Sequence, residues 1–231
     1  MPTPATIHLH PTATLAERVL LPGDPGRALA LAQLLLERPL MFNHNRGLWG
    51  YTGAAADGEP LTIQSTGMGG PSAAIVVEEL VTLGARRLIR VGTCGALDAG
   101  LSLGELVVAS GAHCEDGTSR ALGGGPLAAA DAALTGALAA AARCRSGAVV
   151  SVDLFYDAAA TAPRHGALAV EMEAATLFTL AARRGVAAAA LLIVTDVFDG
   201  DGRRRRITGE ELLDAAERAG RAAAAALGAT R

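Results

Sequence analysis

The sequence predicts a single α/β domain built as a three-layer sandwich, in which helices flank a mixed, mainly parallel sheet. Short apolar segments alternate with segments of helical periodicity, and glycine-rich turns separate them. Strands that alternate with helices form largely parallel sheets covered on both faces. At 231 residues the chain is long enough for a sizeable core. No composition shift marks a boundary, so we expect one domain over residues 1–231.

Apolar runs bounded by turn residues predict the strands, at residues 18–21, 61–64, 88–91, 106–109, 148–152 and 187–194. Apolar residues three or four positions apart predict the helices, at residues 27–37, 71–83, 170–184 and 210–226. Asp24 suits the N-cap of the first helix and Pro25 its first turn, and Thr208 lies near the cap of the last. Residues 121–142 are rich in alanine and glycine, which indicates a loop followed by a surface helix.

The composition is that of an ordinary globular protein and excludes several classes. Charged residues make up 19% of the chain and the formal net charge is −3, so the bulk charge attracts neither nucleic acid nor an anionic membrane. Residues 186–194, the longest apolar stretch, are too few to span a bilayer, and residues 1–4 lack the features of a signal peptide. Cys94, Cys114 and Cys144 fit neither a disulfide framework nor a zinc pattern. We therefore expect a cytoplasmic protein with reduced thiols.

Distinctive residues cluster where the predicted strands end. In sheets of this kind, ligands bind at the carboxyl ends of the strands. Five segments fall there, namely Gly23–Arg27, Thr66–Gly70, Arg90–Gly95, Ser151–Tyr156 and Thr195–Asp196. The dinucleotide-binding fingerprint is absent, because neither glycine-rich turn continues into G-x-G-x-x-G. The sequence thus predicts a ligand site of another kind at this edge of the sheet.

Two arginines near the strand ends point to an anion. Arg27 follows Gly23 at a helix N-terminus, whose free N–H groups favour phosphate. A capped turn with a solvated arginine explains these residues equally well. Arg90 lies inside an otherwise apolar strand, where an unpaired guanidinium is costly. Its partner is either a bound anion or an internal acid, and Thr93 adds a hydroxyl at the same strand end.

Acidic residues occur at positions suited to binding a sugar and to protonating a leaving group. Glu171 and Glu173 lie where a helical pattern begins, so they either favour the helix dipole or accept hydrogen bonds from the vicinal hydroxyls of a ribose. Met172, between them, could pack against the sugar. Asp196 follows the most apolar strand and is either a capping residue or a general acid in an apolar pocket. The run Arg203–Arg206 is interpreted as a solvated loop or as a loop beside an anionic site.

Seven stretches in fixed order form a recognisable set: Leu21–Pro25, Asn45–Gly47, Gly67–Gly69, Arg90–Gly95, Asp153–Tyr156, Val170–Glu173 and Thr195–Asp196. In this set the chain resembles the nucleoside phosphorylase family, and within it the bacterial purine nucleoside phosphorylases related to uridine phosphorylase. The resemblance extends from near residue 8 to residue 196. Each stretch is weak alone, and the combination is specific. It implies a nucleoside phosphorylase-like α/β fold.

The resemblance also implies roles for particular residues. Phosphate is held by Gly23, Arg27, Arg90 and Thr93, and by Arg46 of a neighbouring subunit. The ribose is held by Glu171, Met172 and Glu173, and by His8 of the same neighbour. The base is surrounded by Cys94, Gly95, Val152, Phe155 and Val170, with Asp196 as the acid that protonates it. A homo-oligomer follows, a hexamer built as a trimer of dimers. The implied reaction needs no metal or organic cofactor, and inorganic phosphate is its co-substrate.

The implied activity is the reversible phosphorolysis of purine ribonucleosides and deoxyribonucleosides to free base and pentose 1-phosphate, a reaction of purine salvage. The uridine branch usually has another residue at the position of Asp196, and it places Gln and Arg shortly after the Phe-Tyr pair. Residues 157–161 here contain neither, which favours a purine. The short segment between Tyr156 and Val170 departs from the family pattern. No arginine within 203–206 is singled out to assist Asp196.

Three alternatives stay open at this point. They are a uridine phosphorylase, a nucleosidase of the same fold that uses water, and a non-catalytic protein that binds nucleoside or phosphate. Arg27, Arg46 and Arg90 argue against the nucleosidase, because water needs no cationic cradle. The combination of Asp196 and Glu173 with these arginines argues against the binding protein.

Overall fold

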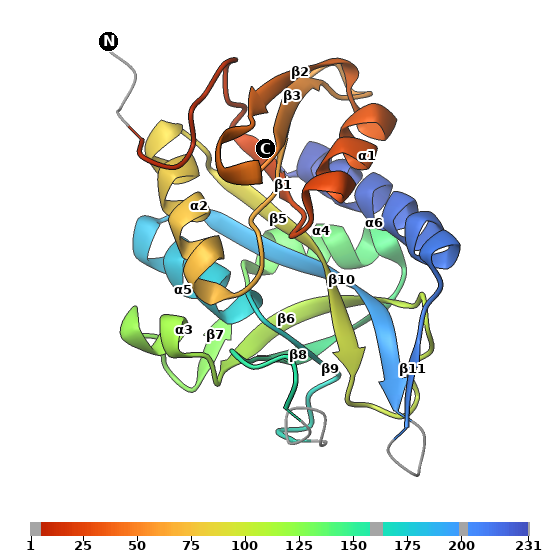
Figure 1. Ribbon diagram of the computed structural model, residues 1–231. Coiled ribbons are helices and arrows are strands. Elements are labelled where there is room, and N and C mark those ends of the chain that lie inside the picture. Colours follow the sequence, from red (N-terminus) through yellow and green to blue (C-terminus); the bar gives the residue numbers. More distant parts are fainter. Residues whose placement is uncertain (1–5, 158–163, 199–202, 231) are drawn as a thin grey trace.

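The computed structural model describes residues 6–157, 164–198 and 203–230, which form a mixed α/β fold (Figure 1). The strands in this part of the chain are β1 Arg18–Leu21, β2 Glu37–Asn43, β3 Gly50–Ala54, β4 Pro60–Gln64, β5 Arg87–Ala96, β6 Leu106–Cys114, β7 Leu127–Ala129, β8 Arg145–Ser151, β9 Ala169–Glu171, β10 Ala187–Phe198 and β11 Arg204–Arg206. The helices are α1 Pro25–Leu35, α2 Gly70–Leu83, α3 Gly117–Ala121, α4 Ala132–Ala142, α5 Ala174–Arg184 and α6 Gly209–Ala229, with a 3-10 turn, η1, at Asn45–Gly47.

The strands form one mixed sheet whose central part closes on itself. The path is β11-β10-β6-β8-β9-β5-β1-β4-β3-β2, and β7 pairs with β6 beside it. A further pairing joins β10 to β5, so β5, β10, β6, β8 and β9 make a closed ring. The four neighbours β4, β1, β5 and β10 are parallel. Their carboxyl ends therefore meet at one edge of the sheet, as the sequence predicts.

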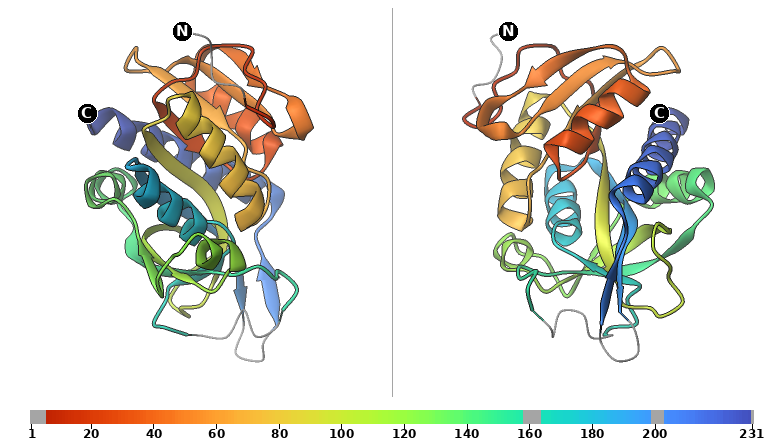
Figure 2. Two further views of the ribbon diagram at one scale, coloured as in Figure 1. Left: turned by 90° about the vertical axis from the view of Figure 1, so that its left-hand side faces the viewer. Right: turned by 45° about the vertical axis from the view of Figure 1, so that its right-hand side comes forward.

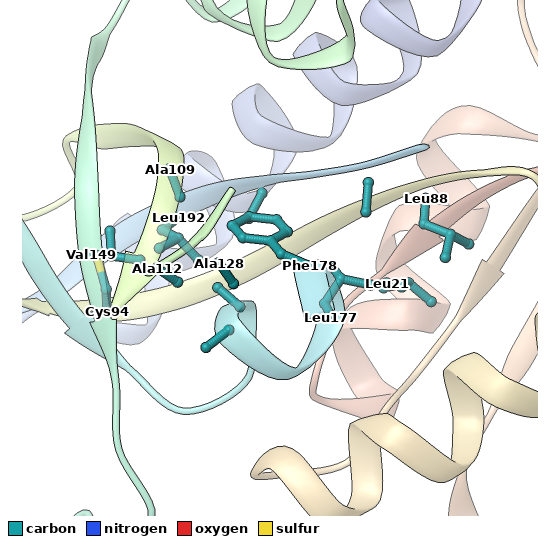
Figure 3. Packing of buried hydrophobic residues seen from close by; sticks show 14 of the residues in the cluster. Leu21, Leu88, Cys94, Ala109, Ala112, Ala128, Val149, Leu177, Phe178 and Leu192 are labelled. Atoms are coloured by element: carbon teal, nitrogen blue, oxygen red, sulfur yellow. The ribbon is translucent and has the colours of Figure 1, made fainter. Parts of the chain in front are cut away.

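Two layers of helices cover the sheet (Figure 2). α2, α3 and α5 lie on one face, and α1, α4 and α6 lie on the other. In Figure 3, Phe178 of α5 lies among small and aliphatic side chains from the strands beneath it, including Ala109 and Leu192. On the other face, Gly220 of α6 packs against the side chains of Leu31 and Leu35 of α1. Small residues replace the scarce aromatics in this core.

Local sequence signals fix most of these elements correctly. Asp24 caps α1 by accepting a hydrogen bond from the backbone N–H of Arg27 at 2.7 Å. Thr208 caps α6 in a reciprocal arrangement with Glu211. The helix expected over residues 27–37 ends at Leu35, and Glu37 instead begins β2.

Three expectations about the strand ends are wrong. β5 does not stop at residue 91 but continues to Ala96, because it pairs with β10 as far as Gly95 and with β9 at Gly95 and Ala96. The segment expected as a helix from residue 170 begins as β9, because Val170 pairs with both Gly95 and Val150, and α5 starts only at Ala174. The segment 203–206 is not a loop where it is described, since Arg204–Arg206 pair with β10 as β11.

No helix in the described ranges is long and apolar enough to cross a membrane. Among the same residues, no group of three or more His, Cys, Asp and Glu side chains is arranged to hold a metal ion. All three cysteines are free thiols. Residues 158–161, which enter the preference for purine over uridine, lie outside the described residues.

Candidate active site

Arg90 on β5 forms the centre of a buried charge cluster. Its Nε lies 3.2 Å from Oε2 of Glu171, and its Nη2 donates a hydrogen bond to Oε2 of Glu173. Of the two partners that the sequence left open for Arg90, the internal acid is therefore present, as the pair Glu171 and Glu173. Nη1 of Arg90 is buried and has no hydrogen-bond partner among the described residues. Because an unpaired buried guanidinium nitrogen is costly, this donor is suited to an added anion.

The position of the Arg90 side chain depends on Gly92, two residues further along β5. A Cβ built at Gly92 would lie 2.7 Å from Cζ of Arg90, so only glycine leaves room for the guanidinium to fold back over the strand. The two carboxylates outweigh the effect of burial and raise the pKa of Arg90. The guanidinium is thus held as a permanent cation with one unused donor.

Glu171 is fixed by the start of α5. Its carboxylate accepts hydrogen bonds from the backbone N–H groups of Glu173 and Ala174 at 2.9 Å, and from the hydroxyl of Ser151 on β8. Ser151 in turn accepts the N–H of Ala175 at 2.8 Å. Burial raises the pKa of Glu171, and the charge of Arg90 opposes that rise. The helix N-terminus favours the anionic form in the same way.

Glu173 bridges two loops of the site. Its Oε1 accepts the backbone N–H of Gly69, at the start of α2, while its Oε2 is bound to Arg90. Met172, between the two glutamates, is half-buried. Carboxylates can accept hydrogen bonds from the vicinal hydroxyls of a ribose, and the role of residues 171–173 in holding one stays a prediction.

A second arginine faces the same place from α1. The guanidinium of Arg27 lies 3.5 Å from the carbonyl oxygen of Val91. Burial and the nearby charge of Arg90 lower the pKa of Arg27. A Cβ built at Gly23 would lie 3.9 Å from Nη1 of Arg90, so the backbone of the β1–α1 turn also reaches the unused donor. Thr93 is part-buried, three residues beyond Arg90 on β5. Two like charges and an orphan donor favour an anion here.

Asp196 lies on β10 where the pairing with β5 is irregular. The register shifts between Val194 and Asp196, and Asp196 lies opposite Gly95. Oδ2 lies 2.7 Å from the hydroxyl of Thr195, and Oδ1 accepts a hydrogen bond from Nε of Arg204 at 2.7 Å. Asp196 is only 4% exposed, so this ion pair is partly desolvated.

Arg204 also contacts an aromatic side chain. Its Cζ lies 4.6 Å from the ring centroid of Phe155, while its Nε holds Asp196. A Cβ built at Gly95 would lie 3.4 Å from Cγ1 of Val170 and 4.0 Å from Cβ of Asp196. The residues expected around the base therefore meet in one place. Val152 packs in a small cluster with Val170, and Cys94 lies buried beneath, where burial raises the pKa of its thiol.

His8 and Arg46 are not brought to this site within the same chain. Nδ1 of His8 is bound to Glu79 on α2 at 2.8 Å. Arg46 lies exposed on η1, with a left-handed backbone at φ 57°. Asn45 links the two by donating to the carbonyl oxygen of His8. The segments that carry His8 and Arg46 are therefore joined through this bond.

Three contributors to the site are not singled out by the sequence. Ser151 holds Glu171, the backbone of Gly69 holds Glu173, and Arg204 holds Asp196. The run Arg203–Arg206 is a visible signal for the third, but four equal arginines give no means of choosing among them. Ser151 and Gly69 lie at strand ends already marked as distinctive, and only the folded chain shows what each contacts.

Comparisons with known proteins show the family of this chain. The model of the phosphorylase superfamily matches residues 17–230, so the chain belongs to that superfamily. The "Purine nucleoside phosphorylase DeoD-type" of Geobacillus kaustophilus is 37% identical over 224 residues, which cover 89% of this chain and 93% of that protein. The proteins of the same name from Jannaschia sp. and Clostridium novyi are 41% and 38% identical, over 83% and 85% of this chain and 87% and 86% of theirs.

Proposed function

We propose that this protein is a purine nucleoside phosphorylase, which converts a purine ribonucleoside or deoxyribonucleoside and inorganic phosphate into free base and pentose 1-phosphate. The observation that carries the proposal is Arg90, which binds two buried carboxylates and keeps one buried donor, Nη1, that has no partner in the part of the chain that the structure describes. The relatives named purine nucleoside phosphorylase support it. We also take residues 1–231 as one phosphorylase domain, since the superfamily match runs through nearly the whole chain.

Phosphate in this proposal binds between the β1–α1 turn and Arg90. Gly23 offers its backbone, Arg27 and Arg90 offer guanidinium donors, and Thr93 offers a hydroxyl. Arginine forks bind phosphate through paired hydrogen bonds, which fixes the orientation of the anion as well as its position. Placed there, a phosphate oxygen can approach the anomeric carbon of a ribose held by Glu173 and Met172. Holding the two reactants in register lowers the entropic barrier to the reaction.

The bond to the base breaks as the sugar becomes oxocarbenium-like. Glu171 and Glu173 are anions beside the sugar and favour its developing positive charge. The base takes the electron pair of the broken bond, and Asp196 in its protonated form gives N7 a proton or a hydrogen bond. The proton that phosphate loses on forming the ester restores the protonated carboxyl, so the overall reaction balances. Arg204 is the arginine that we assign to Asp196, because its Nε is bound to Oδ1 at 2.7 Å. Cys94, Gly95, Val152, Phe155 and Val170 surround the base.

A homo-oligomer completes the site in this proposal. His8 is bound to Glu79 on α2 and Arg46 is exposed on η1, and we propose that both reach the site of a second copy that packs against this face. Exposed apolar side chains in the same part of the chain, Ile7 at 78% and Leu40 at 62%, favour such packing. We propose a hexamer assembled as a trimer of dimers. Three free cysteines suit a cytoplasmic location.

Substrate and phosphate dependence test the proposal together. Purified protein is assayed with inosine, adenosine, guanosine and uridine, each with and without inorganic phosphate. Release of a purine base only when phosphate is present is the expected result. Release without phosphate indicates a nucleosidase, and preference for uridine indicates the pyrimidine branch. Tight nucleoside binding with no release in any reaction indicates a binding protein.

A further inference from the structure

The carboxylate of Glu79 holds the segment that carries His8. Glu79 of α2 accepts hydrogen bonds from the backbone N–H groups of Ile7, His8 and Leu9, at 3.1, 3.0 and 2.7 Å. The same carboxylate contacts Nδ1 of His8 at 2.8 Å. Although burial acts to raise the pKa of Glu79, the hydrogen bonds outweigh it and lower that pKa. Glu79 is therefore an anion that fixes both the backbone and the ring of His8.

A buried asparagine fixes the turn that carries Arg46. Oδ1 of Asn43 accepts the N–H of His10 at 2.9 Å and the N–H of Asn45 at 3.3 Å, while its Nδ2 donates to the carbonyl oxygen of Leu48. Asn43 is fully buried, so these bonds are shielded from water. Asn45 then donates to the carbonyl oxygen of His8 at 2.9 Å. The two segments are thus tied to each other as well as to the fold.

The path of the chain places the N-terminal segment next to the turn that carries Arg46. In Figure 1 the N-terminal segment passes the end of α2, beside the turn between β2 and β3. The N–H of Thr12 continues the link by donating to the carbonyl oxygen of Phe42. Segments more than thirty residues apart in the sequence are held as one rigid unit on the surface.

We propose that Glu79 is a positioning residue for His8. An imidazole whose Nδ1 faces a carboxylate carries its proton on Nδ1, which leaves Nε2 as an acceptor. His8 is then ready to accept a hydrogen bond from a sugar hydroxyl of the ligand in the neighbouring subunit. This inference rests on the proposed function only in naming that ligand.

The helix provides a matched control one residue away. Glu78 is bound to Arg184 of α5, with Nε at 2.7 Å, and makes no described contact with the His8 segment. Glu78→Gln removes a carboxylate and an ion pair from the same helix. Glu79→Gln instead removes the charge that faces His8 and replaces one of its two acceptor oxygens with a donor. An effect seen in Glu79→Gln but not in Glu78→Gln therefore comes from the lost contacts with the His8 segment, and not from a disturbance of α2.

The first test is kinetic. Loss of one charged hydrogen bond to the positioned ring lowers kcat/KM for the nucleoside about tenfold in Glu79→Gln, while Glu78→Gln stays close to the unmodified protein. In a cycle with His8→Ala, the double variant is no slower than His8→Ala alone, because Glu79 acts through His8. Fully additive losses, or equal losses in both glutamine variants, overturn the proposal.

The second test needs no turnover. Nitrogen-15 spectra of neutral His8 in the complete protein are expected to show the proton on Nδ1, and Glu79→Gln is expected to lower that population while Glu78→Gln keeps it. A proton on Nε2 in the unmodified protein, or no change in Glu79→Gln, refutes the positioning role. If the unmodified protein releases no base, the proposed function fails while this measurement still decides the role of Glu79.

Discussion

Replacement of Arg90 by lysine separates the phosphate donor from the structural ion pairs. The guanidinium makes two bonds to carboxylates through Nε and Nη2 and keeps Nη1 unused. Lysine keeps the charge but offers a single ammonium at the end of its stem, which cannot serve Glu171, Glu173 and a phosphate together. The loss is at least one charged hydrogen bond to a buried partner, about 1.5–3 kcal/mol.

The same loss of free energy gives the expected change in the KM for phosphate. If Nη1 binds phosphate, the loss of one charged hydrogen bond raises the KM for phosphate about 10- to 150-fold. Initial rates at saturating inosine, measured over a range of phosphate concentrations, give this value. Urea unfolding of the same variant measures the accompanying fall in the free energy of unfolding.

Arg18 supplies the matched control. It is also a buried arginine, 5% exposed like Arg90, and it binds Asp57 through two nitrogens at 2.6 and 3.0 Å. It begins β1, however, at the opposite end of the strand from the site. Arg18→Lys is expected to lower stability and leave the KM for phosphate unchanged. An unchanged KM in Arg90→Lys, or an equal rise in both variants, refutes the assignment of Nη1 to phosphate.

Three further predictions concern the acid and the stability of the fold. Asp196→Asn is expected to lower kcat for inosine about 100-fold or more, because it removes the general acid. The KM for phosphate is expected to stay unchanged, because the phosphate donors are left in place. A kcat within twofold contradicts that role. Arg204→Ala is expected to lower kcat more than Arg206→Ala does. Nε of Arg204 lies 2.7 Å from Oδ1 of Asp196, whereas Nε of Arg206 lies 3.9 Å from the same atom. Equal losses exclude a special role for Arg204. Hydrogen bonds from Arg18 lower the pKa of Asp57 from 3.8 to about 2, so its contribution to stability is complete above pH 4 and is lost as the pH falls through 2. Urea midpoints between pH 5 and 2 should therefore fall more steeply in the unmodified protein than in Asp57→Asn, and parallel curves contradict the linkage.

Local signals account for most of what the sequence predicts correctly. Asp24 and Thr208 cap helices through contacts within three residues, so the sequence contains both partners of each bond. The apolar core of β10 is visible as a run because both of its faces are covered. The strand ends with Gly23, Arg90 and Asp196 are predicted for the same reason, since each follows or lies in such a run.

The errors arise where partners are distant in the sequence. Val170 fits a helical period with the residues after it, and only its pairing with β5 and β8 makes it a strand residue. β2 has five exposed residues and no alternation, so its pairing with β3 leaves no periodic signal. Arg204 reaches Asp196 only because β11 folds back along β10. Each of these depends on a contact that no local pattern contains.

The fate of phosphate tests the proposed function most directly. Phosphorus-31 NMR is recorded while the purified protein acts on inosine in the presence of inorganic phosphate. If phosphate bound at Arg90 attacks the sugar, a sugar phosphate resonance grows as inorganic phosphate is consumed, in step with hypoxanthine release. Release of hypoxanthine with the phosphate resonance unchanged means that water attacks the sugar, and it contradicts the proposal.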